Sequence, residues 1–213
     1  LYHFFIEESI MTWERILKNC RKYDCYPTIE TFFSTCPPLI RNYLTLQTIP
    51  AGQLLIQAGA PCGTVYILVS GRLQAIEEKA GEIPYSFFDL SPFDIVGDYE
   101  LFSEDAESYV TVRAWEPSAC LTIPPGFYLQ WLSTDSTALF FRTRLLMKKL
   151  SLQLNSSRRY LLMSYGQRCM YVISQEAGKV TPVNGICSLK LNREFLAAKT
   201  GCSLRTVHRI LKD

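Results

Sequence analysis

The pattern of apolar and polar residues changes several times along this chain of 213 residues. Residues 9–23 place their apolar side chains on one helical face, at Ile10, Trp13, Ile16, Leu17 and Cys20. That spacing predicts an amphipathic helix. Shorter helices fit residues 28–35 and 39–45, with Pro37 and Pro38 as the break between them.

From residue 46 to about 125 the helical spacing is lost. Short β-prone runs follow one another, and four glycines punctuate the first of them: Gly52, Gly59, Gly63 and Gly71. Many short strands with closely spaced turn signals are typical of an all-β barrel or jelly roll. The sequence Pro124-Pro125-Gly126 is expected to end it.

A long helix is predicted after a short one at 127–134. Residues 136–163 contain no proline or glycine, and one apolar stripe runs along them: Leu139, Leu146, Leu150, Leu154 and Leu161. Basic residues flank that stripe: Arg142, Arg144, Lys148, Lys149, Arg158 and Arg159. At 1.5 Å per residue, a helix of about 28 residues spans roughly 42 Å, more than one small domain needs. The stripe is therefore expected to meet a second copy of itself; the alternative is packing on its own barrel.

The C-terminal residues predict a helix-turn-helix unit. A helix at 167–177 is expected to end at Gly178. Asn192 caps the next helix, whose inward residues are Phe195, Leu196 and Ala198, and Ser203 caps a last one, whose inward residues are Val207, Ile210 and Leu211. Between them, Gly201 stands where a tight turn needs a positive φ.

The last predicted helix presents polar and basic side chains that suit double-stranded DNA. The candidate DNA-binding residues are Ser203, Arg205, Thr206, His208, Arg209 and Lys212. Arginine donates bidentate hydrogen bonds to guanine, whereas lysine and a helix N-terminus meet phosphate. The alternative is an ordinary helical hairpin with a solvated basic face.

The distribution of charge supports a polyanion partner for one half of the chain. Residues 1–135 hold 8 Lys or Arg against 17 Asp or Glu, whereas residues 136–213 hold 14 against 3. These counts give balances of −9 and +11, hidden in a net charge of +2. Such asymmetry between halves is typical of nucleic-acid binding by one of them.

Composition bears on three further questions: where the protein resides, whether it contains disulfides and whether it is an enzyme. No apolar run is long enough to cross a bilayer and no signal peptide opens the chain, so a cytoplasmic protein is expected. The eight cysteines are scattered without a CxxC pair, which favours reduced, buried thiols. Catalysis is not expected, because the two histidines, His3 and His208, lie outside the barrel and no catalytic spacing is present.

Three stretches together resemble the CRP/FNR family of bacterial transcription regulators. IPAGQLLIQAGAPCGTVYILVSGRL resembles the opening of the family's β-roll, and VGDYELFSEDAESYVTVRAWEPSACLTIP its effector loop and following strands. LNREFLAAKTGCSLRTVHRIL resembles its recognition unit. The likeness covers residues 10–213. It implies an α+β fold: an N-terminal β-roll or jelly-roll barrel, a long central dimerisation helix and a C-terminal helix-turn-helix of the winged-helix type.

The resemblance also implies an organisation and partners. Residues 1–135 would form the effector or sensor domain with its N-terminal helices, 136–163 the dimerisation helix and 164–213 the DNA-binding domain. Homodimers joined through Leu139, Leu146, Leu150 and Leu154 would bind a two-fold operator and act with RNA polymerase. Members continue into a β-hairpin wing beyond the position of Asp213, so the DNA-binding domain is expected to be incomplete here.

The effector loop departs from the cyclic-AMP-binding branch of the family. That branch carries a glutamate after the glycine and an Arg-Ser pair further on, where this chain has Asp98 and Ser108-Tyr109. Between Gly97 and Val112 no Arg or Lys is available for a phosphate. Instead a phosphate would face the acids Asp98, Glu104, Asp105 and Glu107. The candidate effector residues are Gly97, Asp98, Tyr99, Glu100, Ser108 and Tyr109. The sequence predicts an effector other than cyclic AMP, uncharged or cationic, or a vestigial site.

An iron–sulfur or thiol sensor is the alternative mode within the same family. Its candidate ligands are Cys20, Cys25, Cys36 and Cys120, since four thiolates usually hold such a cluster. Their spacing is more open than in the oxygen-sensing branch, and Cys120 falls on a strand position that points it the other way. Haem bound through His3 is weaker still. The cofactor is unknown from the sequence.

The recognition helix departs as well. The family's Arg-Glu-Thr start reads Leu204-Arg205-Thr206 here, so that an arginine replaces the glutamate that commonly reads cytosine, whereas Arg209 matches the family's second arginine. The sequence therefore predicts a transcription regulator with its own operator preference, under the control of an unidentified effector. A sensor module that does not bind an operator is the alternative of another class.

Overall fold

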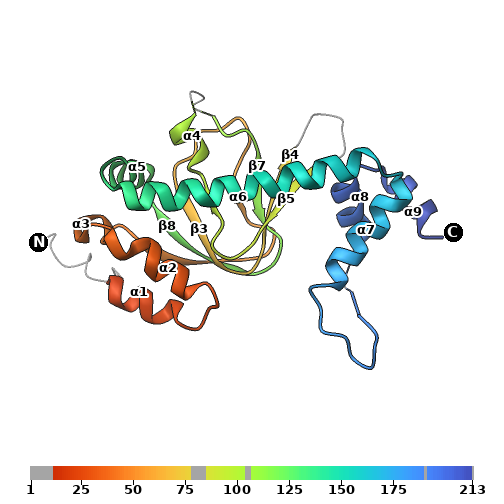
Figure 1. The fold of residues 1–213 in the computed structure, drawn as a ribbon, viewed down its shortest axis with the longest axis horizontal. Helices are drawn as coiled ribbons and strands as arrows, with labels where there is room; N and C mark the ends of the chain where they lie inside the picture. Colours follow the sequence, from red (N-terminus) through yellow and green to blue (C-terminus); the bar gives the residue numbers. More distant parts are fainter. Residues whose placement is uncertain (1–11, 78–84, 104–106, 190, 213) are drawn as a thin grey trace, which may run out of the picture. The chain divides into compact units, whose positions relative to one another are not determined.

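The computed structural model describes residues 12–77, 85–103, 107–189 and 191–212. Figure 1 shows the order of the helices and strands along the chain. The chain divides into two compact units: Leu1–Ala75 with Asp89–Lys148, and Ile76–Phe88 with Lys149–Asp213. The division falls within the long helix. Four earlier candidates, Ile10, His3, Glu104 and Asp105, lie outside the described residues.

The N-terminal helices are short. They are α1 (Trp13–Cys20), α2 (Tyr26–Phe32), the 3₁₀ turn η1 (Phe33–Thr35) and α3 (Pro38–Arg41). The apolar face predicted for the first helix is buried at Trp13, Ile16 and Cys20. The third helix is shorter than expected, because Thr45 already begins the first strand.

Among the described residues, eight strands form the predicted roll. They are β1 (Thr45–Ile49), β2 (Leu54–Ile56), β3 (Val65–Ser70), β4 (Leu73–Glu77), β5 (Tyr85–Leu90), β6 (Ile95–Val96), β7 (Thr111–Ala114) and β8 (Ser118–Ile123). One sheet has the order β1-β8-β3-β6 and the other β2-β7-β4-β5. β8 pairs antiparallel with both β1 and β3, with Cys120 opposite Gln47 and Leu68. The β-roll prediction is confirmed.

Alternate residues of the first sheet face an aromatic core. Val65, Ile67 and Val69 of β3 and Ala119, Leu121 and Ile123 of β8 belong to it together with the N-terminal helices. The ring of Trp131 from α5 (Pro125–Thr134) lies 4.9 Å from that of Phe32 and 5.1 Å from that of Phe33, between ring centroids. This packing fixes the helices against one face of the sheet.

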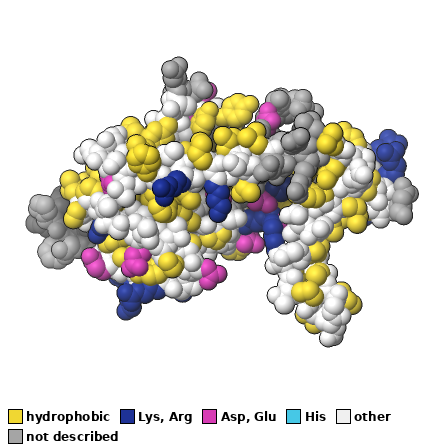
Figure 2. Space-filling view, viewed as in Figure 1, with side chains coloured by type: hydrophobic (Ala, Val, Ile, Leu, Met, Phe, Trp, Pro, Cys, Tyr) yellow, Lys and Arg dark blue, Asp and Glu magenta, His cyan; other side chains and the backbone are white. Residues whose placement is uncertain are grey.

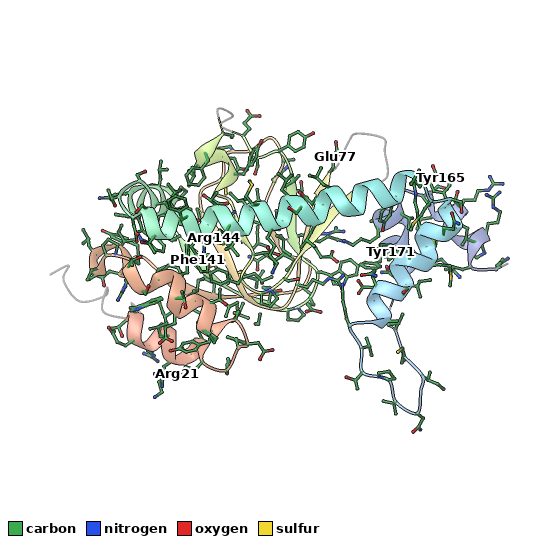
Figure 3. All side chains as sticks on the ribbon, in the orientation of Figure 1. Arg21, Glu77, Phe141, Arg144, Tyr165 and Tyr171 are labelled. Atoms are coloured by element: carbon green, nitrogen blue, oxygen red, sulfur yellow. The ribbon has the colours of Figure 1, made fainter. Side chains whose placement is uncertain are left out.

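The long predicted helix is α6 (Ser136–Leu161), 26 residues in one piece. Asp135 caps it, since Asp135 Oδ1 accepts hydrogen bonds from the backbone N–H of Thr137 and Ala138. Phe141 points from α6 toward the N-terminal helices (Figure 3), and its ring centroid lies 5.3 Å from that of Phe32. The buried side of α6 therefore completes the core of the first unit.

Four leucines of α6 are substantially exposed in the single chain. Their exposed fractions are 40% for Leu139, 39% for Leu146, 47% for Leu150 and 63% for Leu154. Hydrophobic side chains lie open on the face that α6 crosses (Figure 2). Leu139 and Leu146, which belong to the first unit, are thus only partly covered by it, and the side chain of Leu161 lies outside the described set. No helix among the described residues is long and apolar enough to cross a membrane.

Three helices lie in the described C-terminal residues 164–189 and 191–212. They are α7 (Tyr165–Ala177), α8 (Arg193–Thr200) and α9 (Leu204–Ile210). Ser164 opens α7 with a capping box, in which its side chain and that of Gln167 each bond to the other's backbone. The helices predicted at 167–177, after Asn192 and after Ser203 are all present.

Candidate nucleic-acid interface and effector site

The turn between α8 and α9 has the geometry expected from the sequence. Asn192 Oδ1 accepts a hydrogen bond from the N–H of Phe195 at 2.7 Å, and Ser203 Oγ accepts one from Thr206 at 3.1 Å. Gly201 adopts φ 67° and ψ 24°, a left-handed conformation that glycine reaches without steric cost. Together these three residues fix where α9 begins.

The predicted DNA-binding residues lie together on α9 and its ends. Ser203, Arg205, Arg209 and Lys212 are exposed, whereas Thr206 and His208 are half-buried. Within the described residues no ion pair is formed by either arginine. Their guanidinium groups are therefore available to an external acceptor. Such groups suit base edges and phosphate.

Two inward positions differ from the sequence-based expectation. The fully buried alanine of α8 is Ala197, whereas Ala198 is half-buried. On α9 Val207 is fully buried, but Leu211 is 46% exposed because the helix ends at Ile210. The helical spacing identified the correct face of each helix but was wrong by one residue at Ala198, and at Leu211 it extended beyond the last regular turn.

Arg168 of α7 is a supporting residue that the sequence did not reveal. Its guanidinium donates to the carbonyl oxygens of Met163 and Thr200, at 3.2 and 3.4 Å. It also lies over the ring of Tyr165, 5.2 Å from the centroid. Figure 3 labels Tyr165 at the start of α7 and Tyr171 further along the helix. Arg168 thus ties α7 to the end of α8 and is not free for DNA.

In the first unit, Gly97 makes a sharp bend after β6. Its φ is +84°, and a Cβ added there would meet the carbonyl oxygen of Thr64 and lie 2.8 Å from Cys62 Sγ. Only glycine fits this position without a shift of backbone. The bend directs the next residue, Asp98, into the protein, where it is 2% exposed.

Asp98 is held by two side chains from different helices. Arg142 of α6 donates from Nε to Oδ2 at 2.6 Å and from Nη2 to Oδ1 at 2.9 Å. The hydroxyl of Tyr128 on α5 donates to Oδ2 at 3.1 Å. Arg142 is 5% exposed, so this is a buried, bidentate ion pair. Arg142, one of the basic residues expected to flank the leucine stripe, turns its side chain toward the roll.

The two partners of Asp98 respond to it electrostatically. Burial raises the pKa of Tyr128 well above its ordinary value, and the Asp98 carboxylate adds to that effect. Burial is the largest single influence on the pKa of Arg142 and lowers it, but the charge of Asp98 and the hydrogen bonds to it, with smaller contributions from Tyr128 and Asp94, together raise the pKa overall. Tyr128 therefore stays a hydrogen-bond donor and Arg142 stays a cation.

The other candidate effector residues follow on the short helix α4 (Tyr99–Phe102) and beyond it. Ser108 is buried and donates a hydrogen bond from Oγ to Glu100 Oε1, while Glu100 Oε2 is buried without a partner. Tyr99 and Tyr109 are 60% and 68% exposed. The structure thus brings Glu100 and Ser108 together and leaves the two tyrosines in solvent.

Comparison with known proteins agrees with this arrangement. Residues 46–135 match the model of the cyclic nucleotide-binding domain. A relative from Pasteurella multocida, the cAMP-activated global transcriptional regulator CRP, is 26% identical over 194 residues, which are 87% of this chain and 86% of the relative. Its counterpart of the same name in Escherichia coli O157:H7 is 25% identical over 191 residues, with the same coverage. These matches support a transcription regulator of the CRP/FNR family.

Solved structures show the same fold. The regulator CLP of Xanthomonas campestris, described as c-di-GMP responsive, superposes with a TM-score of 0.74 at 22% identity, over 87% of this chain and 89% of that one. A CRP/FNR-family regulator from Eubacterium rectale gives 0.69 at 16% identity, over 82% and 79%. CRP/FNR proteins are DNA-binding transcription regulators, not enzymes.

The cysteines considered for a CRP/FNR-type cluster are buried thiols. Cys20, Cys25 and Cys36 belong to the core beneath the helices, whereas Cys120 does not and alternates with the residues of β8 that do. Burial raises the pKa of Cys20 to about 11 and that of Cys36 and of Cys120 to about 12. Among the described residues no group of three or more His, Cys, Asp or Glu could hold a metal ion.

Proposed function

We propose that this chain is a homodimeric, sequence-specific DNA-binding transcription regulator whose β-roll is not tuned to cyclic AMP. The observation that carries the DNA-binding part is the pair of exposed arginines on α9, Arg205 and Arg209, held in place by the Ser203 cap and the Gly201 turn. Arginines one helical turn apart on the second helix can reach neighbouring base pairs in the major groove.

The homodimer part rests on the uncovered leucines of α6. Leu139, Leu146, Leu150 and Leu154 recur at the spacing of a coiled-coil seam and are substantially exposed in the single chain. A second copy of α6 is the partner that matches such a stripe along its length. Two copies would present two α9 helices to a two-fold operator, and RNA polymerase would be the further partner by family likeness.

The effector part rests on charge at the Gly97 loop, residues 97–109. The described residues of this loop include no Arg or Lys, and the acid after the glycine is paired with Arg142. A cyclic phosphate would therefore meet Glu100 and Glu107 without a cation, at the cost of a charge-assisted bond. The names of the relatives, cAMP-activated and c-di-GMP responsive, describe those proteins, whose effectors we do not extend to this chain.

Control by an effector would act through α6. Repacking along residues 136–163 would change the pose of the two α9 helices, a shift between states of low and high DNA affinity. A full-length protein whose DNA affinity no metabolite, oxidant or reductant changes would exclude this control while leaving operator binding intact. Redox control through the N-terminal cysteines stays a hypothesis that the raised pKa values of these thiols do not favour.

The test is selection of binding sites from a random duplex pool by the full-length protein at two salt concentrations. Recovery of one two-fold symmetric site, with affinity that falls steeply with salt, is the expected result. The Arg205→Ala/Arg209→Ala variant should lose that preference, whereas Arg21→Ala, an exposed arginine of the first unit, should keep it. Weak, sequence-blind binding by the wild type under every effector condition would favour a sensor module without an operator.

A further inference from the structure

Two charged side chains are buried in the part of the chain that the structure describes, and they are partners. Asp98 is 2% exposed and Arg142 is 5% exposed. They come from two elements of the first unit, the loop after β6 and the helix α6. Placing a carboxylate and a guanidinium in an apolar interior costs desolvation energy that a hydrophobic pair would not. Stability alone therefore does not account for this choice of residues.

The geometry of the pair points to positioning. Arg142 meets Asp98 with two parallel N–H groups, a fork that fixes both distance and orientation. The same Nη2 lies 3.4 Å from the carbonyl oxygen of Ile95. Arg142 thus contacts the chain on both sides of Gly97, the residue whose positive φ sets the bend. The bend and the helix are locked to one another by a single side chain.

Arg142 and Tyr128 together occupy most of the hydrogen-bonding capacity of the Asp98 carboxylate. Oδ1 of Asp98 accepts from Arg142 Nη2, and Oδ2 accepts from both Arg142 Nε and the Tyr128 hydroxyl. A carboxylate with these three donors has little capacity left for another ligand. An incoming molecule that needs the Asp98 carboxylate would have to displace the guanidinium first.

We propose that Arg142 is a built-in ligand of the Gly97 loop, and that the chemical class this carboxylate accepts is a guanidinium. The contact through which an external effector would couple the loop to α6 is supplied by the chain itself. The loop is therefore held in its helix-bound position without an added small molecule. This inference deepens the proposed function. Of its tests, only the measurement of DNA affinity rests on the proposed function; hydrogen exchange does not.

Removal and replacement of the guanidinium test the proposal. The full-length Arg142→Ala variant would be compared with wild type by amide hydrogen exchange over residues 95–102 and 136–148. Exchange in both segments should become about 10- to 100-fold faster, because an unpaired buried carboxylate no longer holds them together. Arg144→Ala is the matched control, an exposed arginine on the same helix (Figure 3), and should leave exchange of 95–102 unchanged.

A soluble guanidinium then takes the place of the deleted one. Millimolar methylguanidinium should restore most of the protection in Arg142→Ala, and methylammonium at equal ionic strength should not. The Asp98→Asn/Arg142→Ala variant should exchange fast in these segments and ignore both compounds. Wild-type protection in a folded Arg142→Ala protein, or equal restoration by methylammonium, would overturn the proposal.

Two further readouts keep the outcome decisive. Should Arg142→Ala not fold, the neutral Asp98→Asn/Arg142→Gln variant replaces it, and wild-type exchange at 95–102 in that variant would refute the proposal. Affinity for the selected duplex should fall with Arg142→Ala and recover with methylguanidinium. Absence of any wild-type DNA binding would sink the proposed function alone, since hydrogen exchange still decides the role of Arg142.

Discussion

Arg142 of α6 and the two arginines of α9 lie in opposite environments. Arg142 in α6 is 5% exposed and forms a bidentate ion pair with Asp98. Arg205 and Arg209 in α9 are exposed and form no ion pair within the described residues. The same side chain thus serves two ends. In the first unit the positive charge holds the protein together, and in the second it is left for a partner.

This difference teaches how to read the charge asymmetry of the sequence. The acidic first half does not display its carboxylates uniformly, because Asp98 is neutralised inside the core and Asp89 is paired with Arg72. The basic second half has few acids to pair with, and seven of its described cations are exposed: Arg144, Lys148, Lys179, Arg193, Arg205, Arg209 and Lys212. An excess of one charge therefore predicts a partner only where the structure leaves that charge exposed.

The largest expected effect concerns the exposed side of α6. Leu146→Glu with Leu150→Glu places two carboxylates on the uncovered stripe, where they would repel those of a second copy. Sedimentation velocity should show monomers. Affinity for a duplex with two half-sites should fall about 100- to 10,000-fold as the second contact is lost. Lys148→Glu adds the same charge at an exposed polar position and should stay dimeric; a dimer in the leucine variant would contradict this prediction.

The next largest effect is expected at Gly97, the bend that leads to the buried Asp98. Gly97→Ala adds a Cβ that meets the Thr64 carbonyl oxygen at a backbone φ of +84°. The free energy of unfolding should fall by about 2–4 kcal/mol, measured by urea denaturation. Gly63→Ala is the control, because nothing lies within 4 Å of its added Cβ and its φ is not positive. Equal stability of the two variants would mean that the bend relaxes freely.

A smaller effect is expected for the exposed basic residues at α9. Arg209→Ala should cost about 1–3 kcal/mol of binding free energy and relax the preference at one base pair of each half-site. Lys212→Ala should weaken all sequences alike and lower the salt slope by about 1. Binding to the selected duplex and to single-base variants, measured across a salt series, separates these two patterns. A uniform loss with Arg209→Ala would assign that residue to phosphate instead.

Much of the fold could be predicted from local sequence signals. Strand-forming runs between glycines predicted the roll, and Asn192, Gly201 and Ser203 predicted the start and turn of α8 and α9, since caps and positive-φ turns depend on neighbouring residues. The leucine spacing likewise predicted the uncovered side of α6. These features need no knowledge of distant contacts.

The partner of Asp98 could not be predicted in the same way. Arg142 lies 44 positions further along the chain, and the leucine stripe made it look like one more flanking cation. One signal was present: Arg142 lies four positions after Ala138, on the same side of the helix, and both are buried. Only the packing of α6 on the roll reveals that this side meets an acid. The unpaired Glu100 Oε2 and the role of Arg168 are long-range features of the same kind.

The smallest effect concerns the buried thiols of the first unit, which burial keeps neutral, in contrast to the buried ion pair of Asp98 and Arg142. The pKa values of Cys20, Cys36 and Cys120 are raised by burial from 9.0 to about 11, 12 and 12. In the unfolded chain these thiols ionise near pH 9, so their contribution to stability is complete below that pH. This contribution is lost as pH rises toward their folded pKa values, by about 1.4 kcal/mol per pH unit for each thiol.

Urea denaturation at intervals from pH 8 to 11 measures the free energy of unfolding across this range. Its decline with pH should be shallower for Cys36→Ala/Cys120→Ala than for wild type, and unchanged for Cys187→Ala, whose thiol is half-exposed. Parallel curves for all three proteins would mean that the buried thiols do not govern stability at alkaline pH.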